Sequence, residues 1–145
     1  MSASAWLDLI RDTKAWLALL SAHHALLMTC LIILALSCMT QALWEIFHRG
    51  HSATGLASPS PTARNQLRAY NGMLLGIGIL AIWASVNLDQ ARQLVQALGV
   101  VLLPSALARL ISFRIDGAPH WSSRLYYGVE LGMGLIFLLW PPVSR

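Results

Sequence analysis

The sequence is poor in charged side chains. Aspartate, glutamate, lysine and arginine make up 11% of the 145 residues, whereas about a quarter of a typical soluble chain is charged. The hydrophobic fraction is 57%, and the mean hydropathy is +0.60. These values disfavour a soluble globular domain and indicate an integral membrane protein.

The sequence also lacks the strict alternation of polar and apolar residues that barrel strands require, which excludes a membrane β-barrel. It contains instead four apolar segments that approach or exceed the roughly 20 residues needed to cross the hydrocarbon as a helix. These segments cover residues 22–47, 70–86, 93–113 and 125–140. Because backbone polar groups in lipid are satisfied within helices, we expect an all-α fold in which residues 22–145 form one integral membrane four-helix bundle.

The segment before the first span, residues 1–21, has two alternative interpretations. With two tryptophans on an apolar face, it is typical of an amphipathic interfacial helix that lies among the headgroups; equally, it extends the first span. A cleaved signal peptide is not expected, because the apolar run is too long and begins too far from the start. The apolar residues at helical spacing are Trp6, Leu9, Ile10, Thr13, Trp16, Leu17 and Leu20.

Cysteine and metal-ligand motifs are scarce. Cys30 and Cys38 lie in the same span, so they imply neither a disulfide framework nor a metal site. Glu45 and His48 have the E-x-x-H spacing that carboxylate-bridged metal bundles place on one helix face. Such sites need the motif twice, and the chain has it once. We therefore expect no metal and no other cofactor.

Signals for catalysis and for nucleic-acid binding are also missing. The sequence has no Ser-His-Asp or Cys-His arrangement, no phosphate-binding loop and no zincin motif, so we do not expect an enzyme. The net charge of +4 comes from scattered basic residues, nine of them arginines, with no basic stripe. This distribution favours contact with membrane lipids rather than with nucleic acid.

The connections between the spans differ in character. Residues 48–64 are rich in serine, proline and glycine and predict a flexible loop. Asn87 or Asp89 is expected to cap the third span after a tight connection. Residues 116–119, Asp-Gly-Ala-Pro, form a turn by their chemistry. Pro104 lies inside the third span, where it removes one backbone hydrogen bond and is expected to kink the helix.

Four charged residues fall in one leaflet when the chain crosses four times: Glu45, Arg68, Arg109 and Glu130. At about 1.5 Å per residue, Glu130 lies roughly 8 to 9 Å inside the fourth span and Arg109 roughly 6 Å inside the third. Because a charge in hydrocarbon costs about 2.5 to 3.5 kcal/mol, we expect Arg109 to pair with Glu130. Arg68 is expected to act as a second cation near the headgroups, with Glu45 available to it.

Two interpretations of this charge cluster remain open. The side chains form a ligand-binding or proton-carrying site, or the charges are structural: the pair only fixes helix register, or Arg109 simply reaches toward the headgroups. Glycines on two faces permit close helix packing through G-x-x-x-G spacing, either within one chain or between two. These glycines are Gly72 and Gly76 in the second span, and Gly128 and Gly132 in the fourth.

The last three spans contain a set of spaced polar and glycine residues: Asn65-x-x-Arg68-Ala69-x-x-Gly72-x-x-x-Gly76-x-Gly78, Arg109-x-x-Ser112-x-x-x-Asp116-Gly117-x-Pro119 and Glu130-Leu131. This pattern resembles that of a known bacterial membrane-protein family called domain of unknown function 4345. Members are small four-span proteins, and the resemblance implies no activity. It implies signature polar positions at Asn65, Arg68, Arg109, Asp116, Gly117 and Glu130. Leu75 departs from the pattern, since the family often has an acidic residue there.

These features favour a small bacterial inner-membrane protein that binds or transports an amphipathic molecule, anionic or lipid-like, through the intramembrane arginine and glutamate cluster. Asn65 and Asp116 are further candidates for ligand binding or proton transfer. Membrane lipids are the expected partners, and a chain this short needs to form a homodimer to build a transport path. The alternative is a non-catalytic accessory or scaffold protein in which the charges are structural.

Overall fold

A computed structural model describes residues 3–47, 61–117 and 121–142 of the chain. Within these ranges every regular element is an α-helix and there is no strand, which confirms the all-α prediction. The helices are α1 (Ala3–Phe47), α2 (Pro61–Val86), α3 (Arg92–Ile115) and α4 (Trp121–Leu139).

α1 and α2 each begin earlier than a simple span requires. α1 continues without a break through residues 3–21, so this segment belongs to the same helix as the first span; its placement among headgroups stays a prediction. α2 begins at Pro61, so residues 61–64 are helical and not part of a flexible loop. Proline is well suited to the first helical position, where its missing N–H has no partner to lose. The rest of that loop, including His48, lies outside the described residues.

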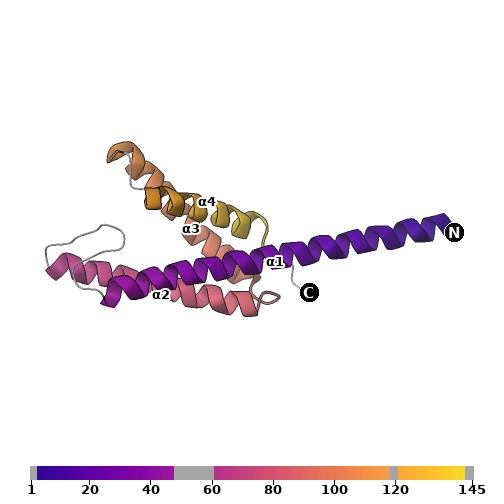
Figure 1. Cartoon of the computed structure of the whole chain (residues 1–145), viewed down its shortest axis with the longest axis horizontal. Helices are drawn as coiled ribbons and strands as arrows, with labels where there is room; N and C mark the ends of the chain where they lie inside the picture. Colours follow the sequence, from indigo (N-terminus) through magenta and orange to yellow (C-terminus); the bar gives the residue numbers. More distant parts are fainter. Residues whose placement is uncertain (1–2, 48–60, 118–120, 143–145) are drawn as a thin grey trace.

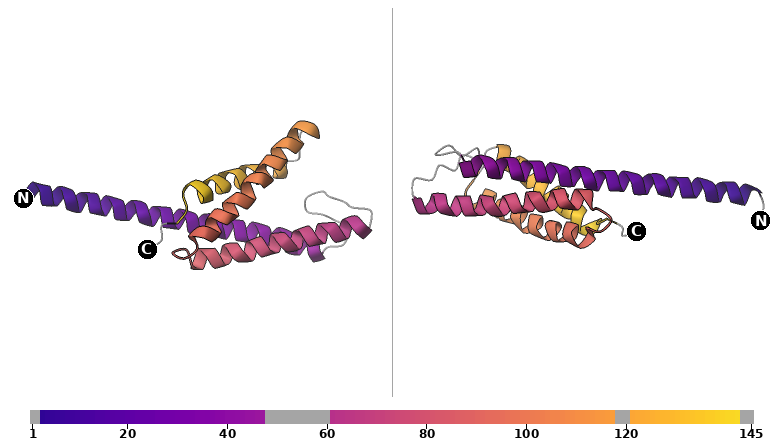
Figure 2. Two further views of the ribbon diagram at one scale, coloured as in Figure 1. Left: turned by 180° about the vertical axis from the view of Figure 1, so that it is seen from behind. Right: turned by 90° about the horizontal axis from the view of Figure 1, so that it is seen from below.

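The four helices form two antiparallel pairs. α1 packs along α2, and α3 packs along α4, with far fewer contacts between the pairs. The pairs meet at the connection between α2 and α3 and diverge from there, as Figures 1 and 2 show. The first residues of α2 and α4 and the last residues of α1 and α3 therefore lie toward the open end. The long N-terminal part of α1 projects beyond the other helices (Figure 1).

The connection between α2 and α3 is made by backbone hydrogen bonds. The Gln90 N–H donates to the Asn87 carbonyl at 2.9 Å, and Ala91 occupies the N-cap position of α3 without a side-chain cap. The predicted capping of α3 by Asn87 or Asp89 is therefore wrong. The Asn87 amide instead donates to the carbonyl of Trp83 at 2.9 Å, which satisfies the end of α2. Pro104 lies inside α3, and the helix continues through it.

Each helix buries one face. On α1 the buried residues are spaced by three or four, which is the spacing of a single helix face. At the end where the two helix pairs meet, Nε2 of His23 lies 3.0 Å from the carbonyl oxygen of Trp140. The His23 ring also stacks on the Trp140 indole, with 4.3 Å between the ring centroids. The central core consists mainly of Leu27, Leu31, Leu34, Ala35, Ala81, Ala84, Val95, Leu98, Leu102 and Phe137.

Close helix approach depends on different glycines from those predicted. A Cβ atom added at Gly99 would lie 3.0 Å from the Gly134 carbonyl oxygen, and one at Gly134 would lie 2.9 Å from the Leu103 side chain. A Cβ atom added at Gly78 would lie 3.2 Å from the Ala35 carbonyl oxygen on α1. By contrast, a Cβ added to either predicted G-x-x-x-G face meets nothing within 4 Å. These two faces therefore make no close helix contact within the described chain. The sequence left open whether Gly72, Gly76, Gly128 and Gly132 pack within one chain or between two, so contact between two chains stays a prediction.

Three helices are long and apolar enough to cross a membrane: residues 12–47, 65–86 and 92–115. Large apolar side chains such as Leu36, Ile79 and Leu110 are exposed on their outer surfaces. Large apolar side chains exposed in this number are typical of contact with lipid. The protein is therefore a membrane protein, whereas α4, which contains Arg124 and Glu130, does not qualify as a span by hydropathy alone.

Candidate functional site: a polar cavity between the four helices

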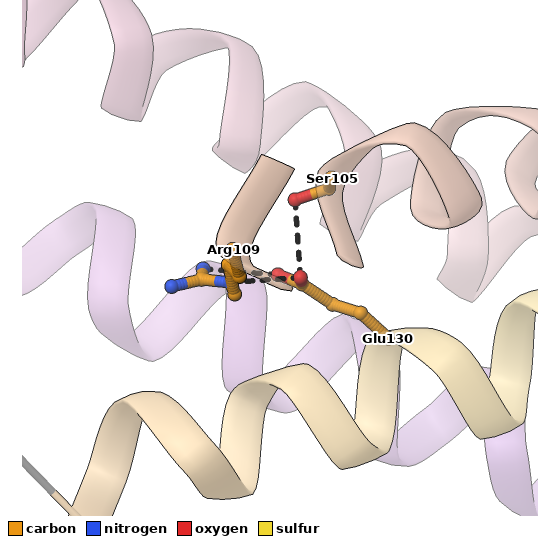
Figure 3. Close-up of polar contacts among 3 residues, drawn as sticks. All are labelled: Ser105, Arg109 and Glu130. Atoms are coloured by element: carbon orange, nitrogen blue, oxygen red, sulfur yellow. Dashed lines mark hydrogen bonds and ion pairs between the residues drawn. The ribbon is translucent and has the colours of Figure 1, made fainter. Parts of the chain in front are cut away.

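Arg109 and Glu130 form a two-point ion pair between α3 and α4. The guanidinium Nε donates to Oε2 of Glu130 at 2.8 Å, and Nη2 donates to Oε1 at 3.0 Å. Figure 3 shows the two side chains facing each other across the helix pair. This parallel arrangement matches the planar fork of arginine to a carboxylate and is the strongest form of such a pair.

Ser105 adds a third hydrogen bond to the carboxylate. It lies one helical turn before Arg109, and its hydroxyl donates to Oε2 of Glu130 at 3.1 Å (Figure 3). The hydroxyl groups of Ser37 and Ser85 donate instead to carbonyls of their own helix. The Ser105 hydroxyl is thus directed across to α4, where it stabilises the charged form of the carboxylate.

One edge of the guanidinium remains available. Nη1 donates to no residue in the described parts of the chain, and Figure 3 shows a terminal nitrogen pointing away from the carboxylate. The Arg109 side chain is 28% exposed, compared with 15% for Glu130. The ring of Tyr126 lies beneath the guanidinium, 5.5 Å from its central carbon to the ring centroid. This cation–π contact holds the cation independently of Glu130.

The ion pair forms one side of a cavity of about 200 Å³, which we call the polar cavity. All four helices contribute to it, and its walls are mainly apolar. Arg109 and Glu130 are its only charged lining residues among those that the structure describes. The lining residues are Leu34, Ser37, Cys38, Gln41, Tyr70, Met73, Leu74, Ile77, Val101, Leu102, Ser105, Arg109, Tyr126, Val129 and Glu130.

A second, more open hollow of about 680 Å³ lies between α1 and α4, and we call it the α1–α4 groove. It shares Ser37, Gln41 and Tyr126 with the polar cavity, so the two spaces adjoin at these side chains. The groove is lined by Ile33, Leu36, Ser37, Thr40, Gln41, Trp44, Ser122 and Tyr126. The cavity that holds the ion pair thus continues into a groove whose lining carries no charged side chain among the described residues.

Comparison with known families identifies the chain. A family model described as domain of unknown function (DUF4345) matches residues 26–141. The chain belongs to this family. The match extends from α1 to just beyond α4, so it includes every residue that lines the polar cavity. No curated protein and no solved structure matches the chain.

The signature positions that the resemblance to DUF4345 implied are distributed unevenly around the cavity. Arg109 and Glu130 line it, whereas Asn65 and Arg68 are exposed on α2 and do not. Asp116 is also exposed, where it accepts a hydrogen bond from the Ser112 hydroxyl at 2.7 Å. These positions therefore do not converge on one site. Gly117 adopts a φ of +94°, which L side chains rarely adopt, and this backbone conformation supports the predicted turn.

The sequence predicted Arg68 as a second cation near the headgroups with Glu45 available to it, and this stays a prediction. Arg68 is exposed on α2, whereas Glu45 is buried on α1. On α2 the cavity is lined by Tyr70, Met73, Leu74 and Ile77; at about 100° per residue, a position two before Tyr70 points away from it. Glu45 is 6% exposed, one turn beyond Gln41 on α1, but it does not line the polar cavity.

Several cavity residues carried no sequence signal that singled them out. Ser37, Gln41, Tyr70, Ser105 and Tyr126 are uncharged, so a search for intramembrane charge does not find them. One signal was available for Ser105, because residues at i and i+4 share a helix face and Ser105 precedes Arg109 by four. The same rule relates Tyr126 to Glu130 on α4.

Proposed function

We propose that this protein crosses a bacterial inner membrane four times and binds or transports a small amphipathic molecule in the polar cavity. Pairing supports α4 as the fourth span. The two-point ion pair joins Glu130 to Arg109 on the neighbouring helix, and a paired charge is the form in which ionisable side chains are tolerated inside a membrane. α4 also packs along α3, which is itself apolar enough to span.

The observation that carries this proposal is the joining of the two compartments. The polar cavity offers the Nη1 edge of Arg109, two tyrosines and the side chains of Ser37 and Gln41. Its volume of about 200 Å³ is below the roughly 300 to 1,000 Å³ of sites for whole drug-sized ligands. It therefore suits the polar head of a ligand. The adjoining α1–α4 groove, about 680 Å³, suits a single apolar chain.

The accessory or scaffold role is the second candidate, and the completeness of the ion pair favours it. Both carboxylate oxygens of Glu130 are engaged, by Arg109 and Ser105. A buried pair of this kind can specify how two helices pack without binding anything. In that role the cavity and the free guanidinium edge have no purpose, which is why we place this candidate second.

Native mass spectrometry of the detergent-purified protein tests the proposed function. We expect wild-type protein to carry a co-purified adduct with the mass of a single-chain amphiphile. Arg109→Gln should lose most of it, because the side chain that presents the donor edge to the cavity is gone. Arg68→Gln is the matched control: it removes an arginine that does not line the cavity, so its adduct should equal that of wild type. Wild-type spectra free of adduct, or an equal adduct in all three proteins, would contradict the proposal.

A further inference from the structure

The polar cavity is electrically neutral as it stands. Its two charged residues, Arg109 and Glu130, cancel, and the rest of its lining is uncharged or apolar. An anionic head entering alone would leave one negative charge unbalanced among apolar walls, at a cost of several kcal/mol. Binding of an anion therefore needs a second event that restores neutrality.

The groups around Glu130 indicate which event that is. Arg109 and Ser105, both from α3, bond to the carboxylate, and Cys38 from α1, Tyr70 from α2 and Tyr126 from α4 line the same cavity. Among these groups only the carboxylate can lose its charge by taking up one proton. A serine hydroxyl both donates and accepts, so Ser105 can bond to either form of Glu130.

We infer that an anionic single-chain amphiphile displaces Glu130 from the Arg109 guanidinium and that Glu130 takes up one proton as it leaves. The anion then accepts the hydrogen bonds from Nε and Nη2 that the carboxylate held, next to the available Nη1, while Tyr126 keeps the guanidinium in place. One anion and one proton enter together, so the cavity stays neutral. This inference rests on the proposed function and names its ligand class and its coupling.

Calorimetric titration measures this coupling directly. Decanesulfonate is the probe, because its head stays ionised, and the protein is held in phosphatidylcholine nanodiscs with empty nanodiscs as blank. Comparing buffers with different ionisation enthalpies gives the protons taken up per ligand bound. We expect about one proton per sulfonate, and an affinity that falls about tenfold per pH unit where Glu130 of the empty cavity is ionised. Decanol, a neutral head on the same chain, should bind with no proton uptake.

Variants assign the proton to Glu130. Glu130→Gln resembles the protonated side chain, so it should bind decanesulfonate without proton uptake and independently of pH, while Glu130→Asp should restore uptake. Circular dichroism confirms that each variant is folded. Equal proton uptake in wild type and Glu130→Gln would overturn the inference. Binding of decanol alone would overturn it and leave the proposed function standing, whereas binding of neither probe would remove both.

Discussion

Replacement of Glu130 by alanine is expected to lower the free energy of unfolding by about 3 kcal/mol. The change leaves the Arg109 guanidinium without its carboxylate partner in mostly apolar surroundings, and breaking a buried pair from one side costs about 3 to 5 kcal/mol. Both side chains retain some exposure, which places the expected loss at the lower end of that range. Thermal or denaturant unfolding in one detergent, followed by helical circular dichroism, measures the difference.

Removing both partners should restore much of this loss. In Arg109→Leu with Glu130→Leu no charge is left unpaired, and apolar replacement of a buried pair is often neutral or stabilising. The exchange Arg109→Glu with Glu130→Arg keeps the pair in reversed order and should also recover stability. Arg68→Ala is the control and should change little. Equal loss in Glu130→Ala and Arg68→Ala would contradict the energetic role assigned to the pair.

The double leucine variant also separates the two candidate functions. If the ion pair only fixes helix packing, decanesulfonate binding is the same in the wild-type protein and in the stable double variant. If the pair belongs to a ligand site, the double variant is stable and binds no anionic amphiphile. The test needs no knowledge of the physiological ligand, because decanesulfonate binding supplies the readout.

Filling the polar cavity is expected to weaken ligand binding while the protein stays folded. Val129 lies on α4 between Tyr126 and Glu130 and lines the cavity. The indole of Val129→Trp would occupy space that the ligand head needs, so we expect the affinity for decanol to fall at least tenfold, or about 1.4 kcal/mol. Overpacking also costs stability, typically about 1 to 3 kcal/mol. Titration in nanodiscs measures affinity, and circular dichroism checks the fold.

Val100→Trp provides the matched control. Val100 is exposed on α3 and lines neither the cavity nor the groove, so the same substitution there adds an indole to the lipid-facing surface. It should leave the affinity for decanol unchanged. Equal affinities in the two variants would show that the ligand does not occupy the polar cavity.

The pairing of Arg109 with Glu130 could be predicted from sequence because it depends on depth along two helices. Counting residues from a span end gives depth at about 1.5 Å per residue, and two charges at similar depth in apolar surroundings have a strong reason to meet. The presence of the helices could also be predicted from the sequence, because long apolar runs indicate them. The N-terminal extension of α1 was one of two open interpretations, since an interfacial helix has a similar residue pattern.

The remaining site predictions depended on how each helix is rotated about its own axis, which residue counting does not give. Depth places Arg68 near the cavity, but its angular position on α2 turns it outward, and the sequence does not reveal which face of α2 meets the other helices. The glycines illustrate the same point. A G-x-x-x-G spacing identifies a smooth face, yet Gly99 and Gly134, outside such spacing, make the close contacts because α3 and α4 cross there.

Photo-crosslinking is the most direct test of whether the polar cavity holds the head of an amphiphile. The probe is an alkyl sulfonate with a diazirine on the carbon next to the head, bound to wild-type protein in nanodiscs and mapped by peptide sequencing. We expect labels on cavity residues such as Met73, Tyr126 and Val129, and we expect unlabelled decanesulfonate to reduce this labelling. Labels spread over lipid-facing residues such as Ile79 and Leu110, without competition, would contradict this expectation.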